Sequence, residues 1–220
     1  MKKTFSILSI LILLIFNSCN REVNSTNEIE TIKSNTNARI PGEPVDPNEL
    51  LIEELSQDQD FISLKNNLES FFSDIPNKDN FIANYNESNF NSGGENYFLN
   101  LTGYTNAQVL SKITSIRQNT TNLLNKYPTL KTQSSQTIQT IVESAYNQYV
   151  GNSGELAQKP DPCKECAKTW RPRMIWSTIM GGISGGLFGG GNPYGPWAGA
   201  VIGFASAGWG ALDCLKTAGC

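Results

Sequence analysis

The chain has 220 residues, with 17 Lys and Arg against 20 Asp and Glu, a net charge of -3 and no histidine. Proteins that bind nucleic acid carry a basic surface, so this balance argues against a nucleic-acid partner. The lack of histidine removes the commonest general base and a common zinc ligand, and we therefore expect no enzyme, no metal site and no cofactor.

Residues 1–18 begin with Lys2 and Lys3, and the stretch from Phe5 to Phe16 is almost wholly apolar. This pattern is typical of an export signal, because a transmembrane helix needs about 20 apolar residues. With a cysteine directly after Ser18, the segment resembles a bacterial lipoprotein signal peptide. The resemblance implies a lipidated Cys19 as the first mature residue and attachment to the cell envelope, at the outer membrane of a Gram-negative bacterium. Ordinary signal cleavage is the alternative.

Residues 19–45 are polar, lack aromatic side chains and approach a proline-rich stretch. Such a composition cannot bury enough apolar surface to offset the entropy of ordering the chain. We expect a disordered tether that holds the rest of the protein away from the membrane, rather than a sorting signal.

Residues 46–151 are predicted to form a small helical bundle, because apolar residues recur at spacings of three and four. Asp46 and Thr105 stand where N-caps are expected, Pro76 and Pro128 where helices stop, and Gly151 at a helix C-terminus. The stretch "NESNFNSGGEN" is expected to be a loop. The expected helical stripes, interpreted as ordinary core rather than a ligand pocket, are Leu50, Leu51, Leu55, Phe61, Leu64, Leu68, Phe71, Phe72, Phe81, Ile82, Tyr85, Val109, Leu110, Ile113, Ile116, Leu123, Leu124, Tyr127, Ile138, Ile141, Val142, Ala145, Tyr146 and Tyr149.

A Gly- and Pro-rich boundary at 151–162 leads into residues 160–220, where no charged side chain lies between Met174 and Leu212. The breaker cluster "NPYGP" divides this uncharged run into two arms. The first arm extends from about Met174 to Gly190 and the second from Trp197 to about Leu215. The sequence predicts a Gly-rich helical hairpin, so the overall fold class is mainly α, a small helical bundle followed by this hairpin.

Small residues recur at spacings of four in both arms, and the helix-packing candidates are Gly181, Gly185, Gly189, Gly199 and Gly203. Such stripes let helix backbones approach closely and are favoured inside membranes. In water each glycine costs about 1 kcal/mol relative to Ala in a helix interior. The stripes therefore indicate membrane association or tight helix–helix contact, which can also join copies into a homo-oligomer. A Gly-rich loop without a first helix is the alternative.

Four cysteines remain if Cys19 carries lipid, namely Cys163, Cys166, Cys214 and Cys220. Two precede the first arm and two follow the second, so folding at the breaker cluster brings them together. In an oxidising compartment we expect disulfides, with Cys166–Cys214 and Cys163–Cys220 favoured among the three pairings. A redox-active Cys-x-x-Cys pair and a four-cysteine zinc site are the alternatives.

The segment from about Asp161 to Cys220 resembles bacteriocin-like peptides, and it also resembles the glycine-zipper segments of envelope lipoproteins. The second resemblance implies a lipid-anchored envelope protein whose hairpin associates with a membrane in a structural or interaction role. The first implies an antimicrobial or pore-forming effector, with residues 46–151 as its carrier or pro-region.

Overall fold

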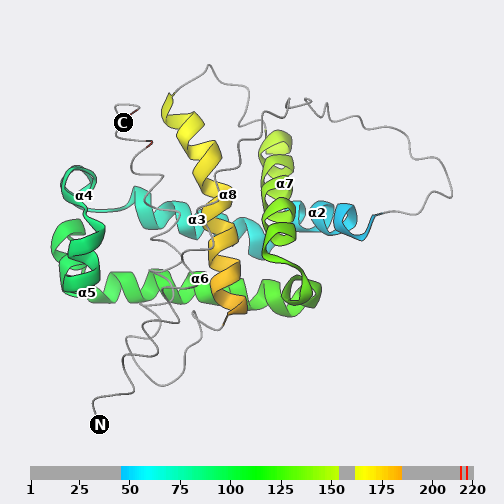
Figure 1. The fold of residues 1–220 in the computed structure, drawn as a ribbon, viewed down its shortest axis with the longest axis horizontal. Helices are drawn as coiled ribbons and strands as arrows, with labels where there is room; N and C mark the ends of the chain where they lie inside the picture. The colour runs from blue at the N-terminus through cyan, green and yellow to red at the C-terminus, as the bar shows by residue number, and fades with distance from the viewer. Residues whose placement is uncertain (1–45, 154–161, 185–213, 215–216, 218–220) are drawn as a thin grey trace, which may run out of the picture. The chain divides into compact units, whose positions relative to one another are not determined.

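The computed structural model describes residues 46–153, 162–184, 214 and 217, which belong to one compact unit, Pro44–Cys220 (Figure 1). Within these residues the chain is almost wholly helical and contains no β-strand, so the prediction of a mainly α fold is confirmed. The elements are α2 (Pro47–Gln57), α3 (Gln59–Ser73), α4 (Lys78–Asn84), α5 (Glu87–Thr102), α6 (Asn106–Lys126), the 3-10 helix η1 (Pro128–Thr132), α7 (Ser135–Ser153) and α8 (Pro162–Ile183).

Helix N-termini lie where the capping residues predict them. The Asp46 carboxylate accepts a hydrogen bond from the backbone N–H of Asn48 at 2.9 Å, and Pro47 follows as the first residue of α2. Thr105 and Gln108 form a reciprocal capping box at the start of α6. Each cap satisfies backbone N–H groups that have no partner inside the helix, which fixes the point where the helix begins.

The stretch "NESNFNSGGEN" was expected to be a loop, and this prediction is wrong, because it lies largely within α5. Asn86 caps the helix by accepting a hydrogen bond from the backbone N–H of Asn89 at 3.1 Å. Gly103 ends it with a φ of 74°, a left-handed conformation that suits glycine. The following turns bury Phe98 and Leu101 in the core, so packing outweighs the low helix propensity of the Asn- and Gly-rich start.

The predicted apolar stripes form one continuous core, in which α3 and α6 are the central pair. Leu50 and Leu110 are exceptions and are 42% and 39% exposed. A polar contact also joins the central pair, because the side-chain amide of Asn67 donates to the amide oxygen of Asn119 at 2.8 Å. Further polar contacts between the two helices, such as the amide of Asn122 donating to the Asp60 carboxylate at 2.9 Å, help to fix their register.

Helix α8 packs against α3, α6 and α7, and Figure 1 shows it beside α7 and running across α6. Its residues Met174, Ile175 and Ile179 are buried in the same core as the stripes of α6 and α7. The sequence placed these three residues in the first arm of a separate hairpin. The difference has a simple physical reason, since their spacing aligns them on one side of α8, where the bundle covers them. None of the described helices is long and apolar enough to cross a membrane.

Candidate functional site

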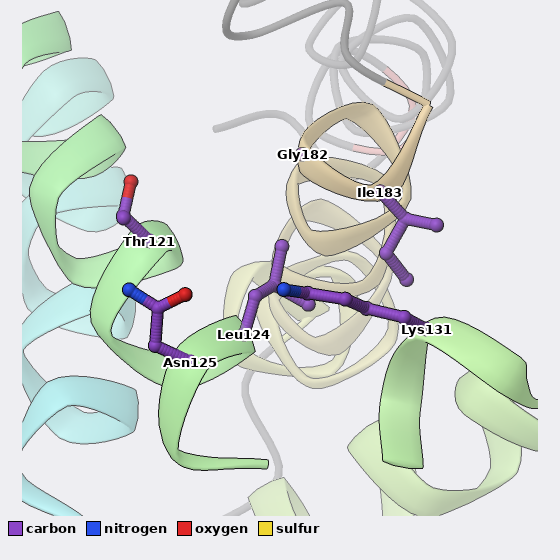
Figure 2. A pocket seen from close by; sticks show the side chains of 6 residues that line it. All are labelled: Thr121, Leu124, Asn125, Lys131, Gly182 and Ile183. Carbon is purple, nitrogen blue, oxygen red and sulfur yellow. The ribbon is translucent and has the colours of Figure 1, made fainter. Parts of the chain in front are cut away.

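A pocket of about 440 Å³ lies between the C-terminal half of α6, η1 and the last turn of α8 (Figure 2). It lies where the described part of the uncharged run ends, at Ser184. The lining residues are Thr121, Leu124, Asn125, Lys131, Gly182 and Ile183.

The pocket combines an apolar surface with one cation. Leu124 is buried and belongs to the core, and Ile183 packs partly buried against the same core. Figure 2 shows the Lys131 side chain reaching from η1 toward Leu124 of α6, and both residues line the pocket. Thr121 and Asn125 add a hydroxyl and an amide from α6, and the lining residues that the structure describes include no acidic side chain. The arrangement suits an anion that carries an apolar group.

Local structure places the pocket cation. Pro128 cannot continue α6, and the chain turns into η1, where the backbone N–H of Leu130 donates to the carbonyl of Tyr127 at 3.1 Å. The Leu130 side chain is fully buried and holds η1 against the core. Lys131 follows directly and is therefore directed outward, over the pocket.

The end of α6 is also tied to the start of α3 by a buried carboxylate. Asp58 Oδ1 accepts the backbone N–H groups of Asp60 and Phe61, and Oδ2 accepts Lys126 Nζ and, at 3.0 Å, the Tyr127 hydroxyl. Burial raises the pKa of Asp58, but these hydrogen bonds outweigh it, and the pKa lies below its usual value. The same burial and the bond to Asp58 raise the pKa of Tyr127. The cluster is structural, because its groups satisfy one another.

A second charged cluster holds α8 in place. The Glu69 carboxylate on α3 pairs with Lys65 Nζ at 3.2 Å and with Arg171 Nε of α8 at 3.1 Å. The Lys65 side chain is only 5% exposed, and its ammonium group lies 5.3 Å from the ring centre of Tyr149 on α7. Glu69 therefore ties α8 to α3, and its partner Lys65 also contacts α7, which fixes the position of α8 along α3.

Few of the predicted site residues lie in the described part of the chain. Cys166 is buried in α8 and is joined to Cys214, with Cα atoms 5.7 Å apart. Gly181 lies half-buried in the last turn of α8. Among the described residues no group of His, Cys, Asp and Glu could hold a metal ion. Cys163 lies in the first turn of α8. The predicted residues outside the described part are Cys19, Cys220, Gly185, Gly189, Gly199 and Gly203.

Comparison with known protein families, with characterised proteins and with solved structures finds no match for this chain. Its function must therefore be inferred from its own residues. The sequence did not point to the pocket, because Lys131 and Gly182 are far apart along the chain and only the packing of α8 against α6 brings them to one cavity.

Proposed function

We propose that the protein is a lipid-anchored component of the cell envelope, in which the bundle presents the Gly-rich segment to a membrane in a structural or interaction role. One observation carries this proposal. The uncharged run from Met174 to Leu212 begins as a core helix of the bundle and continues beyond it. Among the described residues the run contributes Met174, Ile175 and Ile179 to the core, so the bundle holds the run at this end.

The part of the run that α8 does not use has the composition of a membrane-associating segment. No charged residue lies between Ser184 and Asp213, and the stretch contains two tryptophans, Trp197 and Trp209, with glycines between its apolar residues. The free energy falls when apolar surface of this kind leaves water, and tryptophan favours the interface between water and lipid. The signal-like N-terminus and Cys19 would supply the anchor.

The cysteine pairing supports a segment that doubles back. Ile183 ends α8, whereas Cys166 lies near its beginning, 17 residues earlier, a helical length of about 26 Å. A hairpin in the residues between Ile183 and Cys214 would return the chain over that distance and is compatible with a bond between Cys166 and Cys214. A second helical arm from Trp197 to about Leu215 has about this length, so we retain the Gly-rich hairpin and both disulfides as part of the proposal.

The effector hypothesis fits the packing less well. It requires residues 160–220 to separate from residues 46–151 after a cut within 151–162. That separation would remove Met174, Ile175 and Ile179 from the core of the bundle and expose the surface that they cover. An envelope protein that keeps both parts together does not expose this apolar surface to water.

The anchor is tested by fractionating cells that produce the chain with Cys19 or with Cys19→Ser. We expect the unaltered chain in the membrane fraction, with a mass that includes the lipid, and the variant uncleaved or released. An unaltered chain whose mature N-terminus carries no lipid contradicts the anchor.

The membrane role of the Gly-rich segment is tested separately, with liposomes and a chain of residues 20–220, because the apolar stretch from Phe5 to Phe16 would itself bind lipid if it were retained. We expect the chain to float with the liposomes, and Gly185→Leu to reduce flotation by separating the arms of the hairpin, because overpacking typically costs about 1–3 kcal/mol. Gly186→Leu is the matched control, since it lies about 100° around a helix. Leakage of a trapped dye favours the effector, binding without leakage favours the envelope role, and a chain that ignores liposomes contradicts both.

A further inference from the structure

We propose that the pocket between α6, η1 and α8 binds an anion carried on an alkyl chain, such as the carboxylate of a medium-chain fatty acid. The ammonium group of Lys131 would pair with the anionic head, and the chain would lie against Leu124 and Ile183 (Figure 2). This site is independent of Cys19 and of the membrane role proposed above.

The charge of the pocket favours an anion. The ion pairs among the described residues join Lys65, Lys112, Lys126, Lys168 and Arg171 to carboxylates, and none of them involves Lys131. None of the six described residues that line the pocket is acidic. Lys131 is exposed, so its ammonium group is accessible to an anion that enters the pocket from water.

The shape and the remaining lining favour an alkyl chain on that anion. Pockets that bind small molecules commonly have volumes of about 300–1,000 Å³ and are mostly apolar, with a few polar groups that orient the ligand. The cavity of about 440 Å³ falls in this range. Leu124 and Ile183 offer the apolar contact, and the Thr121 hydroxyl and the Asn125 amide lie on the α6 side, within the same lining.

The test is calorimetric titration of the Cys19→Ser full chain, so that no acyl chain of the anchor competes. The probes are decanoate, decyl phosphate, uncharged decanol and butyrate. We expect saturable binding of a decyl anion at least tenfold tighter than that of decanol, and no measurable binding of butyrate. The stronger of the two decyl anions identifies the head as a carboxylate or a phosphate. Equal affinities for decanol and the decyl anions, or no saturable binding, would overturn the proposal.

Two pairs of variants locate the binding. Lys131→Gln should reduce the affinity for the decyl anion to that for decanol, whereas Lys78→Gln, an exposed lysine of α4 outside the described ion pairs, should leave it unchanged. Thr121→Leu should fill the pocket and abolish binding. Thr114→Leu is its control, because both hydroxyls donate to the carbonyl four residues earlier in α6. Equal effects within either pair contradict the assigned site.

Discussion

The hydroxyl of Tyr127, at the end of α6, donates a hydrogen bond of 3.0 Å to the carboxylate of Asp58, which caps the start of α3. The two residues are 69 positions apart in the chain, so the bond closes a long loop of the fold. Asp58 also accepts from Lys126 and from two backbone N–H groups, so one buried side chain joins the start of α3 to the end of α6.

Asp58→Asn should destabilise the protein by about 2–4 kcal/mol, because hydrogen bonds to a charged group each contribute about 1.5–3 kcal/mol and the amide cannot accept all of the donors. Asp46→Asn is the matched control. Asp46 is also an N-cap but is exposed, and Asn caps helices about as well as Asp, so its effect should stay within about 0.5 kcal/mol. Midpoints of urea unfolding measure both effects, and equal midpoints for the two variants contradict the role assigned to Asp58.

The stability should also depend on pH through Asp58. Its pKa is lower in the folded protein than its usual value of 3.8, so the folded state favours the carboxylate. This contribution is present above about pH 4 and is lost as the pH falls toward the lower folded pKa. Urea unfolding between pH 2 and pH 6 should show stability falling with acid, with a smaller slope in Asp58→Asn. An unchanged slope in that variant would assign the acid sensitivity to other carboxylates.

The sequence was sufficient to predict the helices wherever a local signal exists. Asp46 and Thr105 cap as expected, and the spacing of Phe61, Leu64 and Leu68 identifies a buried face of α3. Such signals involve residues within one or two helical turns of each other, so they can be recognised in a single sequence. The buried carboxylate of Asp58 could not be predicted in the same way, because an Asp before a helix normally indicates only a cap.

The sequence was least informative where contacts between distant segments decide whether a helix forms and what it packs against. The start of α5 has a loop-like composition, and its helix depends on Phe98 and Leu101 packing in the core. Helix α8 has apolar residues over much of its surface, and periodicity alone does not say whether a bundle or a second arm covers them. The pocket beside Lys131 forms only because α8 packs against the bundle.

The membership of α8 in the bundle predicts the effect of a core substitution. Ile179 is fully buried, and Ile179→Ala should destabilise residues 46–153 together with α8 by about 2–4 kcal/mol, since it leaves a cavity in a shared core. Thr169→Ala on the exposed side of the same helix should stay within about 0.5 kcal/mol. Unfolding in urea, followed by the circular dichroism of the helices, measures both changes in stability. A variant with Ile179→Ala that unfolds like the unaltered chain would place α8 outside the cooperative unit.

The disulfides can be tested by digestion without reduction. We expect one linked species that joins the peptide with Cys163 and Cys166 to the peptide with Cys214 and Cys220. A bond between Cys166 and Cys214 spans a sequence separation of 48 and should contribute about 4 kcal/mol in the chain-entropy model. Reduction should therefore lower the thermal midpoint, whereas Cys19→Ser should not. Four free thiols in freshly isolated protein, or bound zinc, would contradict the pairing.

Cleavage between α7 and α8 gives the sharpest test of how the two parts of the chain are related. A protease recognition site introduced within residues 154–161 would divide the chain into a fragment with α2 to α7 and a fragment that begins with α8. The four cysteines after Cys19 all lie in the second fragment, so no disulfide joins the two. Only packing holds them together, mainly through Met174, Ile175 and Ile179 and the pair of Glu69 with Arg171.

We expect the two fragments to elute together from a sizing column in buffer and to separate in denaturant. Ile179→Ala should weaken their association, because it removes core contact without changing any charge. Release of the second fragment in buffer, with the first fragment still helical, would show that the bundle does not need α8. That result would restore the effector hypothesis, in which residues 46–151 serve as a carrier that is discarded. Fragments that stay together support a protein that works as one unit, with the Gly-rich segment held at the end of its own core.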